Sequence, residues 1–292
     1  MKKKIVLMLT VIMLIGLAGC GKNQINIKET GTSDNNEQMV QNIYENKRTE
    51  VKQKISEIKE RLPETSAEDK GTCGSKAKWY YKDNTLIIYG EGVITEDTWH
   101  KSNIVINTVV IDSGITKLGN NMFSGLGSEV GKNIENFYIA DGLEEIGSST
   151  FVNCDCLSEI VLPPSLYFID GYTFASCDSL KNVYMTDGVE KIGDSAFTGC
   201  KSLDSIFIPK TVLAIGNGVF TGCNNLSDIQ ISKDNRIFSE KNNCIINNDT
   251  KTLIYAINKD FSIPDDILCI AEDAIYGCEI DSLVIPEGVK EI

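Results

Sequence analysis

The sequence predicts a repeat solenoid, built mainly of β-strands and turns, with a period of 23 residues. Phenylalanine, cysteine, leucine and a β-branched residue each return at this interval in the central part of the chain. A fixed period of this size indicates coils that bury their apolar faces only against neighbouring coils. The four aligned positions are Phe151, Phe174, Phe197 and Phe220; Cys154, Cys177, Cys200 and Cys223; Leu157, Leu180, Leu203 and Leu226; Ile160, Val183, Ile206 and Ile229.

Each coil has a strand and an opposite wall. The consensus is Cys-x-x-Leu-x-x-Ile-x-Ile-Pro-x-x-Val-x-x-Ile-Gly-x-x-x-Phe. Its Ile-x-Ile part alternates with the period of a strand whose apolar side faces inward, and Val-x-x-Ile supplies the opposite wall. The phenylalanine closes the space between the walls. We therefore expect a right-handed stack of coils with one parallel sheet, whose strands lie about 4.8 Å apart.

Residues 1–19 have the pattern of an export signal. Lys2 to Lys4 form a positive start, an apolar run follows, and Leu17-Ala18-Gly19-Cys20 ends it. The last four residues resemble the lipobox of bacterial lipoproteins, which implies cleavage before Cys20 and lipidation of that cysteine. Two acyl chains would suffice for stable anchoring on the outer face of a bacterial membrane. An uncleaved membrane anchor is the alternative.

Between this segment and the repeats, residues 20–35 are polar and aperiodic, and indicate a flexible tether. Residues 36–62 are expected to form a helical stalk, because Val51, Ile55, Ile58 and Leu62 recur on one helical face. That face could pair in a coiled coil or pack on the next domain, or the helix could stand alone. Residues 63–71 are a linker.

The repeat domain begins with a predicted hairpin cap at residues 72–103, and the solenoid covers residues 104–292. Residues 232–260 interrupt the period, with an inserted hairpin at about 244–257. The register then returns with an expected strand at 261–264. The last repeat is incomplete, because the sequence stops at Ile292.

This pattern resembles the BspA-type leucine-rich repeats of bacterial surface proteins over residues 71–292. The resemblance implies a surface-exposed binding protein, often adhesive. The opening Gly71-Thr72-Cys73-Gly74 and the following hairpin are similar to the N-terminal cap of that family. The family has no shared catalytic residues and no single ligand, so the resemblance assigns no site.

The residues that carry chemistry argue against an enzyme, a cofactor or a metal. His100 is the only histidine, and no metalloprotease or nucleophile-elbow motif is present. A net charge of −13 without a basic patch makes nucleic acid a poor partner. The repeating cysteines hold a core position, which favours buried thiols over disulfides or a metal site. Cys73 and Cys156 lie off this ladder and could be exposed.

The candidate ligand-binding site is a column of strand residues that points away from the core: Tyr138, Val161, Tyr184 and Phe207. An exposed apolar stripe tends to mark an interaction surface. The stripe predicts an extracellular protein partner, or a glycan that stacks on the aromatic rings. Cross-strand packing is the alternative explanation of the stripe. A structural spacer of the envelope is the alternative function. The outward stripe discriminates the two, because a spacer has no need of it.

Overall fold

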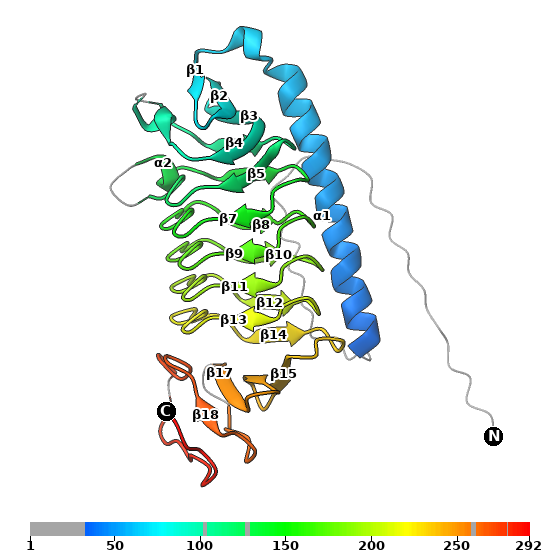
Figure 1. Ribbon diagram of the computed structural model, residues 1–292, viewed down its shortest axis with the longest axis vertical. Helices are drawn as coiled ribbons and strands as arrows, with labels where there is room; N and C mark the ends of the chain where they lie inside the picture. The colour runs from blue at the N-terminus through cyan, green and yellow to red at the C-terminus, as the bar shows by residue number, and fades with distance from the viewer. Residues whose placement is uncertain (1–32, 102–103, 126–128, 258–260, 279) are drawn as a thin grey trace, which may run out of the picture.

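The computed structural model describes residues 33–101, 104–125, 129–257, 261–278 and 280–292. Its coils stack into a solenoid, with a long N-terminal helix along one side (Figure 1). The predicted fold class is therefore confirmed. The signal segment and Cys20 lie outside the described residues.

Two walls of parallel strands face each other across the core. The first wall holds β4 (Thr108–Ile111), β6 (Asn136–Ile139), β8 (Glu159–Val161), β10 (Asn182–Tyr184), β12 (Ser205–Ile208) and β14 (Asp228–Ile231). The second wall holds β5 (Ile115–Leu118), β7 (Glu145–Ile146), β9 (Phe168–Ile169), β11 (Lys191–Ile192) and β13 (Ala214–Ile215). Equivalent residues of neighbouring coils pair in register, as Ile160 does with Val183. The sequence predicted one parallel sheet, but the Val-x-x-Ile wall also pairs, through short strands.

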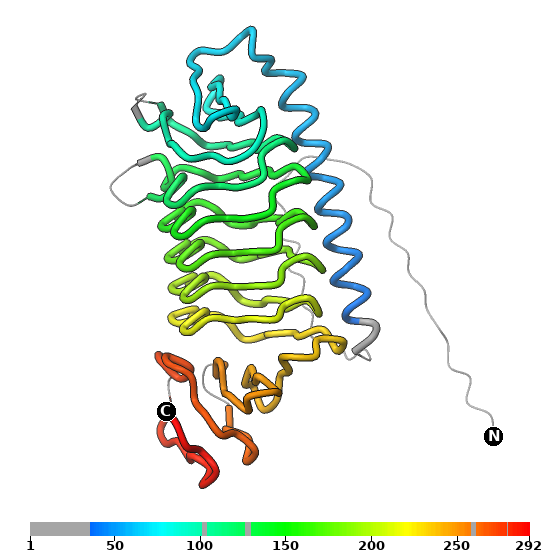
Figure 2. Tube along the Cα trace, viewed as in Figure 1, coloured from blue at the N-terminus to red at the C-terminus, as the bar shows by residue number. Residues whose placement is uncertain are grey.

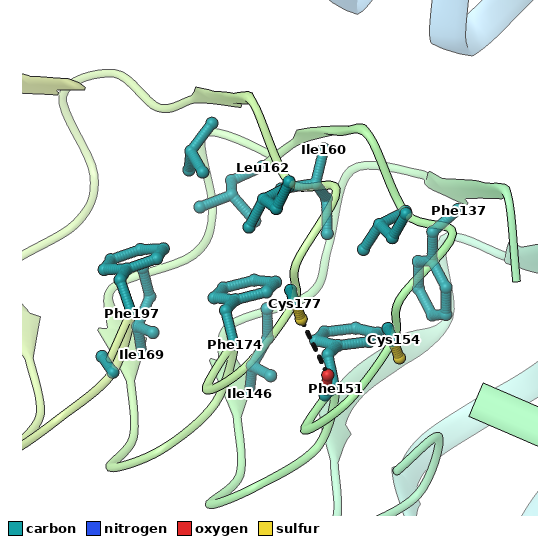
Figure 3. Packing of buried hydrophobic residues seen from close by; sticks show 14 of the residues in the cluster. Phe137, Ile146, Phe151, Cys154, Ile160, Leu162, Ile169, Phe174, Cys177 and Phe197 are labelled. Atoms are coloured by element: carbon teal, nitrogen blue, oxygen red, sulfur yellow. Dashed lines mark hydrogen bonds between the residues drawn. The ribbon is translucent and has the colours of Figure 1, made fainter. Parts of the chain in front are cut away.

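The core between the walls consists of stacked phenylalanine rings (Figure 3). The rings of Phe174 and Phe197 lie 5.3 Å apart with planes 4° from parallel, and both side chains are fully buried. The cysteine of each coil also lies in the core. The Cys177 thiol donates to the Phe151 carbonyl of the preceding coil at 2.9 Å. The thiols of Cys154, Cys200 and Cys223 each donate likewise to the phenylalanine carbonyl of the coil before their own. These cysteines are unpaired and buried, as their core register predicts.

Close backbone approach explains the glycine that ends the second wall. A Cβ on Gly193 would lie 2.5 Å from the Gly171 nitrogen of the adjacent coil, a distance that no side chain accommodates. The spacing between coils thus requires glycine here for space.

An antiparallel cap closes the N-terminal end of the solenoid. It consists of β1 (Asp69–Thr72), β2 (Lys76–Lys82) and β3 (Thr85–Ile94), and β3 continues into pairs with β4 and β5. The β2–β3 hairpin lies where the sequence predicts it. The expectation that Cys73 could be exposed is wrong, because its side chain is fully buried in the cap. Cys156 is exposed. The short helices η1 (Glu64–Ser66), η2 (Thr98–Lys101) and α2 (Glu129–Lys132) lie in connections.

The inserted segment interrupts the first wall. Strands β15 (Phe238–Lys241), β16 (Cys244–Asn247) and β17 (Thr252–Ala256) form an antiparallel meander, and β17 pairs with β18 (Cys269–Ile270). The predicted hairpin is therefore present, with one further strand. The strand expected at residues 261–264 is absent, since that segment has an irregular backbone.

The predicted helix is α1 (Ser33–Arg61), and it lies along the outer side of the first wall. Its course along the stacked coils is visible in the backbone trace (Figure 2). Of the arrangements that the sequence left open, the structure shows packing on the repeat domain, and a free stalk is wrong for these residues. The helix begins three residues earlier than expected, within the segment assigned to the tether.

Candidate functional site on the outer sheet face

The outer face of the first wall carries one continuous column of side chains. Backbone register aligns Tyr80 with Ile87, Val110 and Tyr138 in successive strands. It also aligns Val161 with Tyr184, and Phe207 with Gln230. The predicted stripe is thus one column, as the alternation of the strands requires. It begins three strands before Tyr138, at Tyr80 in the cap.

Helix α1 covers most of this column. Its apolar residues Tyr44, Val51, Ile55 and Ile58, with Leu62 just beyond its end, form one buried cluster with the column. Val110 is fully buried and Val161 is 4% exposed, although both point away from the solenoid core. Tyr138 and Tyr184 are partly buried against the same cluster. The face that the sequence predicts as exposed is therefore the surface on which the chain's own helix packs.

The spacing of the helix contacts matches the spacing of the strands. The contacting residues follow alternating steps of four and three: Glu37, Gln41, Tyr44, Arg48, Val51, Ile55, Ile58 and Leu62. An average step of 3.5 residues advances a helix by about 5.3 Å, close to the strand separation of about 4.8 Å. A helix that crosses the strands can therefore place roughly one residue on each strand.

Toward the start of α1, these contacts become polar. The Tyr44 hydroxyl donates to the Leu162 carbonyl at 2.8 Å, and the buried Arg48 guanidinium donates to the Ile139 carbonyl at 3.0 Å. One turn closer to the start of α1, the Thr186 hydroxyl donates to the Gln41 side-chain oxygen at 2.9 Å. At the first turns, the Ser232 hydroxyl donates to the Glu37 carboxylate at 2.5 Å. Hydrogen bonds of this kind fix the position of the helix along the solenoid.

Ion pairs lie along the edges of the helix. Lys47 meets Glu159 at 2.9 Å, Lys59 meets Asp112 at 2.5 Å, and Asp141 lies 2.6 Å from Arg48. Burial alone would raise the pKa of Asp141, but Lys52 and Arg48 outweigh it and hold that pKa below its ordinary value. Burial also raises the pKa of Tyr138 and of Tyr184. These surroundings therefore favour the ionised form of Asp141 and the neutral form of both tyrosines.

The predicted binding site is only partly correct, because most of its residues are covered. Tyr138, Val161 and Tyr184 lie under α1, so the premise that they form an exposed stripe is wrong in this conformation. The hydrophobic stripe of α1 indicated that the helix has a partner surface. The continuation of the four-and-three spacing through Arg48 and Gln41 was the signal that could have extended this surface to the start of the helix.

Phe207 lies where this cover is incomplete. It is only partly buried, and it lines a small hollow between Val40, Ile43 and Tyr44 of α1 and strands β10 to β14. A larger hollow of about 500 Å³ adjoins it. Asn36 and Glu37 of α1, consecutive residues of β14, and Phe238 to Glu240 in β15 line this second space. The outer face is therefore accessible at its β14 end.

The other candidate groups include His100 and the residue types that bind metals. His100 lies in the cap, where its Nδ1 is 2.6 Å from Asp97 and its ring contacts Trp99. Over the ranges that the structure describes, no three histidine, cysteine or acidic side chains are placed to hold a metal ion. The same ranges contain no helix that is long and apolar enough to span a membrane.

Comparison with known proteins agrees with this architecture. Residues 129–249 and 254–292 match the family model of the BspA type leucine rich repeat region, in six copies. A leucine-rich repeat protein from Eubacterium ventriosum is similar in structure, with a TM-score of 0.66 and 22% identity over 76% of this chain. The pneumococcal vaccine antigen PcpA is similar with a TM-score of 0.55 and 18% identity over 77% of this chain.

At these identities, the two structures support the fold alone. The matches cover 61% and 66% of the lengths of those two chains. No curated protein matches the chain. The family model accounts for more than half of the residues, and the period, the stacked phenylalanines and the paired walls agree with it. The chain therefore belongs to the BspA-type leucine-rich repeat family.

Proposed function

We propose that this chain is a lipid-anchored binding protein of the bacterial surface that takes a protein partner at the β14 end of its outer sheet face. Family membership supports the general role, since BspA-type repeat proteins are typically found at the bacterial cell surface and are generally not enzymes. The observation that carries the site is the partly buried Phe207 beside an open hollow. Aromatic residues at the edge of a hollow are common anchors for protein partners.

A matched pair of variants tests the binding site. Bacteria that display the full chain would carry either Phe207→Ser or Leu213→Ser, and binding to purified extracellular proteins would be measured. Leu213 is 58% exposed and precedes β13 in the second wall, so its loss removes apolar surface at a distance from the site. We expect Phe207→Ser to reduce binding at least tenfold and Leu213→Ser to leave it unchanged. Equal effects would place the site elsewhere.

The anchor is tested separately. The lipobox-like sequence ending at Cys20 motivates this part of the proposal. Metabolic labelling with a fatty acid should mark the native chain and not Cys20→Ala, and the variant should stay unprocessed or be shed. A variant of mature size that is still acylated and fractionates with membranes would refute lipidation at Cys20.

A structural spacer is the second candidate function, and one observation favours it. Helix α1 accounts for the apolar column from Tyr80 to Tyr184 without any ligand. A spacer would bind nothing at Phe207, and the Phe207→Ser variant would then have no effect on any interaction of the cell surface.

A further inference from the structure

Strand β14 ends the first wall, and among the described residues one of its edges has no strand partner. Its partner is β12, and the next strands in the chain, β15 to β18, form a separate sheet. The sequence predicts a following strand at residues 261–264, and the backbone there is irregular. The hollow of about 500 Å³ is lined by residues 228 to 233 without a gap. Because side chains of a strand alternate between faces, an unbroken run of lining residues means that the backbone edge itself borders the hollow.

The geometry of the ladder identifies the groups on this edge. In a parallel ladder, the N–H and C=O groups of alternate residues point to opposite neighbours. The Leu162 N–H donates forward to the Tyr184 carbonyl in the next strand at 2.9 Å. Ile231 holds the equivalent position in β14, while the Ser232 N–H donates backward to the Ile208 carbonyl. The N–H and C=O groups of Ile229 and Ile231 therefore face the hollow.

The opening also reaches the core. Ile231 occupies an inward position whose equivalents in other coils, Leu162, Met185 and Ile208, are at most 3% exposed. Ile231 itself is only partly buried. A strand added beside β14 would cover it, and would continue the wall by one more strand.

We propose that the β14 edge binds an extended segment of a partner protein by strand addition. The claim rests on the proposed binding function and gives its mode of recognition. Main-chain hydrogen bonds to Ile229 and Ile231 supply affinity, and alternate side chains supply specificity. One set of side chains packs inward against Ile231 and Phe238, and the other set extends the column after Phe207 and Gln230.

Charge selects the kind of segment. The carboxylates of Glu37, Asp228 and Glu240 line the hollow, together with one lysine, Lys233. Lysine–aspartate pairs already join neighbouring coils of the solenoid, as where Lys181, just before β10, meets Asp204 of the next coil at 3.2 Å. The segment that fits is therefore an extended peptide with alternating apolar residues and a basic residue at its start.

The chain's own β10 provides a probe of this chemistry. Residues 180–185, Leu-Lys-Asn-Val-Tyr-Met, made as a capped and fluorescently labelled peptide, have the required pattern. Two versions of equal mass carry two N-methyl groups each. In one version they replace the N–H groups of Asn182 and Tyr184, which would face β14. In the other they replace those of Val183 and Met185, which would face away. Fluorescence anisotropy with the full chain in detergent measures binding.

Strand addition predicts that the second version binds as the unmodified peptide does and that the first binds at least tenfold more weakly. Hydrogen exchange at Ile229 and Ile231 should slow when the unmodified peptide is bound. Asp228→Asn should weaken binding and reduce its dependence on salt.

Equal binding of the two methylated versions, or no binding of the unmodified peptide to the folded chain, overturns the proposal. The two failures are distinct. If Phe207→Ser abolishes partner binding on cells while no peptide binds, the binding function stands and strand addition is wrong. If the peptide binds as described but Phe207→Ser changes nothing on cells, the edge is real and the proposed function is wrong.

Discussion

Phe197 and Phe207 show how position within one coil decides the role of a residue. They lie ten residues apart, and both are phenylalanine. Phe197 closes the space between the walls, stacked on Phe174 and Phe220, and is fully buried. Phe207 lies between the inward-facing Ile206 and Ile208, so the alternation of the strand turns it outward.

Truncation of these two residues should therefore have unequal costs. Phe197→Ala leaves a cavity in a packed ring stack and should lower the free energy of unfolding by about 3–5 kcal/mol. Phe207→Ala should cost about 1 kcal/mol, within the range of ordinary substitutions. Chemical denaturation monitored by circular dichroism measures both. Similar losses would mean that the strand register is off by one residue.

The sequence could identify these core and outward positions because the 23-residue period fixes them. It could not place Cys73, which lies off the ladder and is buried by the cap. Nor could it foresee that a buried Arg48 binds the Ile139 carbonyl. Such contacts join segments far apart in the chain, and no local pattern reports them.

At the scale of elements, α1 is the part of the fold that the sequence predicts but does not place. A stripe at helical spacing indicates a partner surface, and it does not say whether that surface is another helix, a sheet or a second molecule. The outer column of the first wall carried the complementary signal. The stripe of the sheet alone suggested an external partner, and the stripe of the helix left its partner open, but in the structure the two stripes cover one another.

Introducing a charge into the covered face should release the helix. Ile55 is 8% exposed against the sheet, while Gln53 in the same helix is exposed. Ile55→Asp should release α1, because a buried unpaired carboxylate is unfavourable. The released helix should unfold locally and be cut by trypsin at its lysines, while the solenoid stays resistant. Gln53→Asp should leave the digestion pattern unchanged. A resistant helix in Ile55→Asp would mean that α1 is held by its polar contacts alone.

The ion pairs of α1 should make its docking sensitive to acid. The pKa of Asp141 is lowered in the folded state, so its contribution to stability is complete above the ordinary aspartate value, about 3.9, and is lost as pH falls through the lower folded pKa. The difference in unfolding free energy between the native chain and Asp141→Asn should therefore be largest near neutral pH and shrink toward pH 3. A constant difference would show that Asp141 acts without its charge.

In the whole molecule, the 23-residue period predicts the solenoid, and the places where the period breaks predict the cap and the inserted segment. Each coil contacts mainly its neighbours, so local rules propagate along the array. The open edge of β14 could not be predicted, because residues 261–264 keep the sequence pattern of a strand. The inserted meander displaces this segment from the wall. The proposed site thus lies where the sequence pattern of the repeat predicts a strand and the backbone forms none.

Helix α1 packs along the outer face of the sheet and leaves a hollow of about 500 Å³ at the β14 end of that face. Zero-length carbodiimide cross-linking of the native full chain, followed by mass spectrometry, measures whether the helix lies on the sheet. Amine and carboxylate groups in contact should couple, so we expect intramolecular links from Lys47 to Glu159 and from Lys59 to Asp112, which lie 2.9 Å and 2.5 Å apart. If links within α1 form but neither of these two does, the helix does not lie on the sheet.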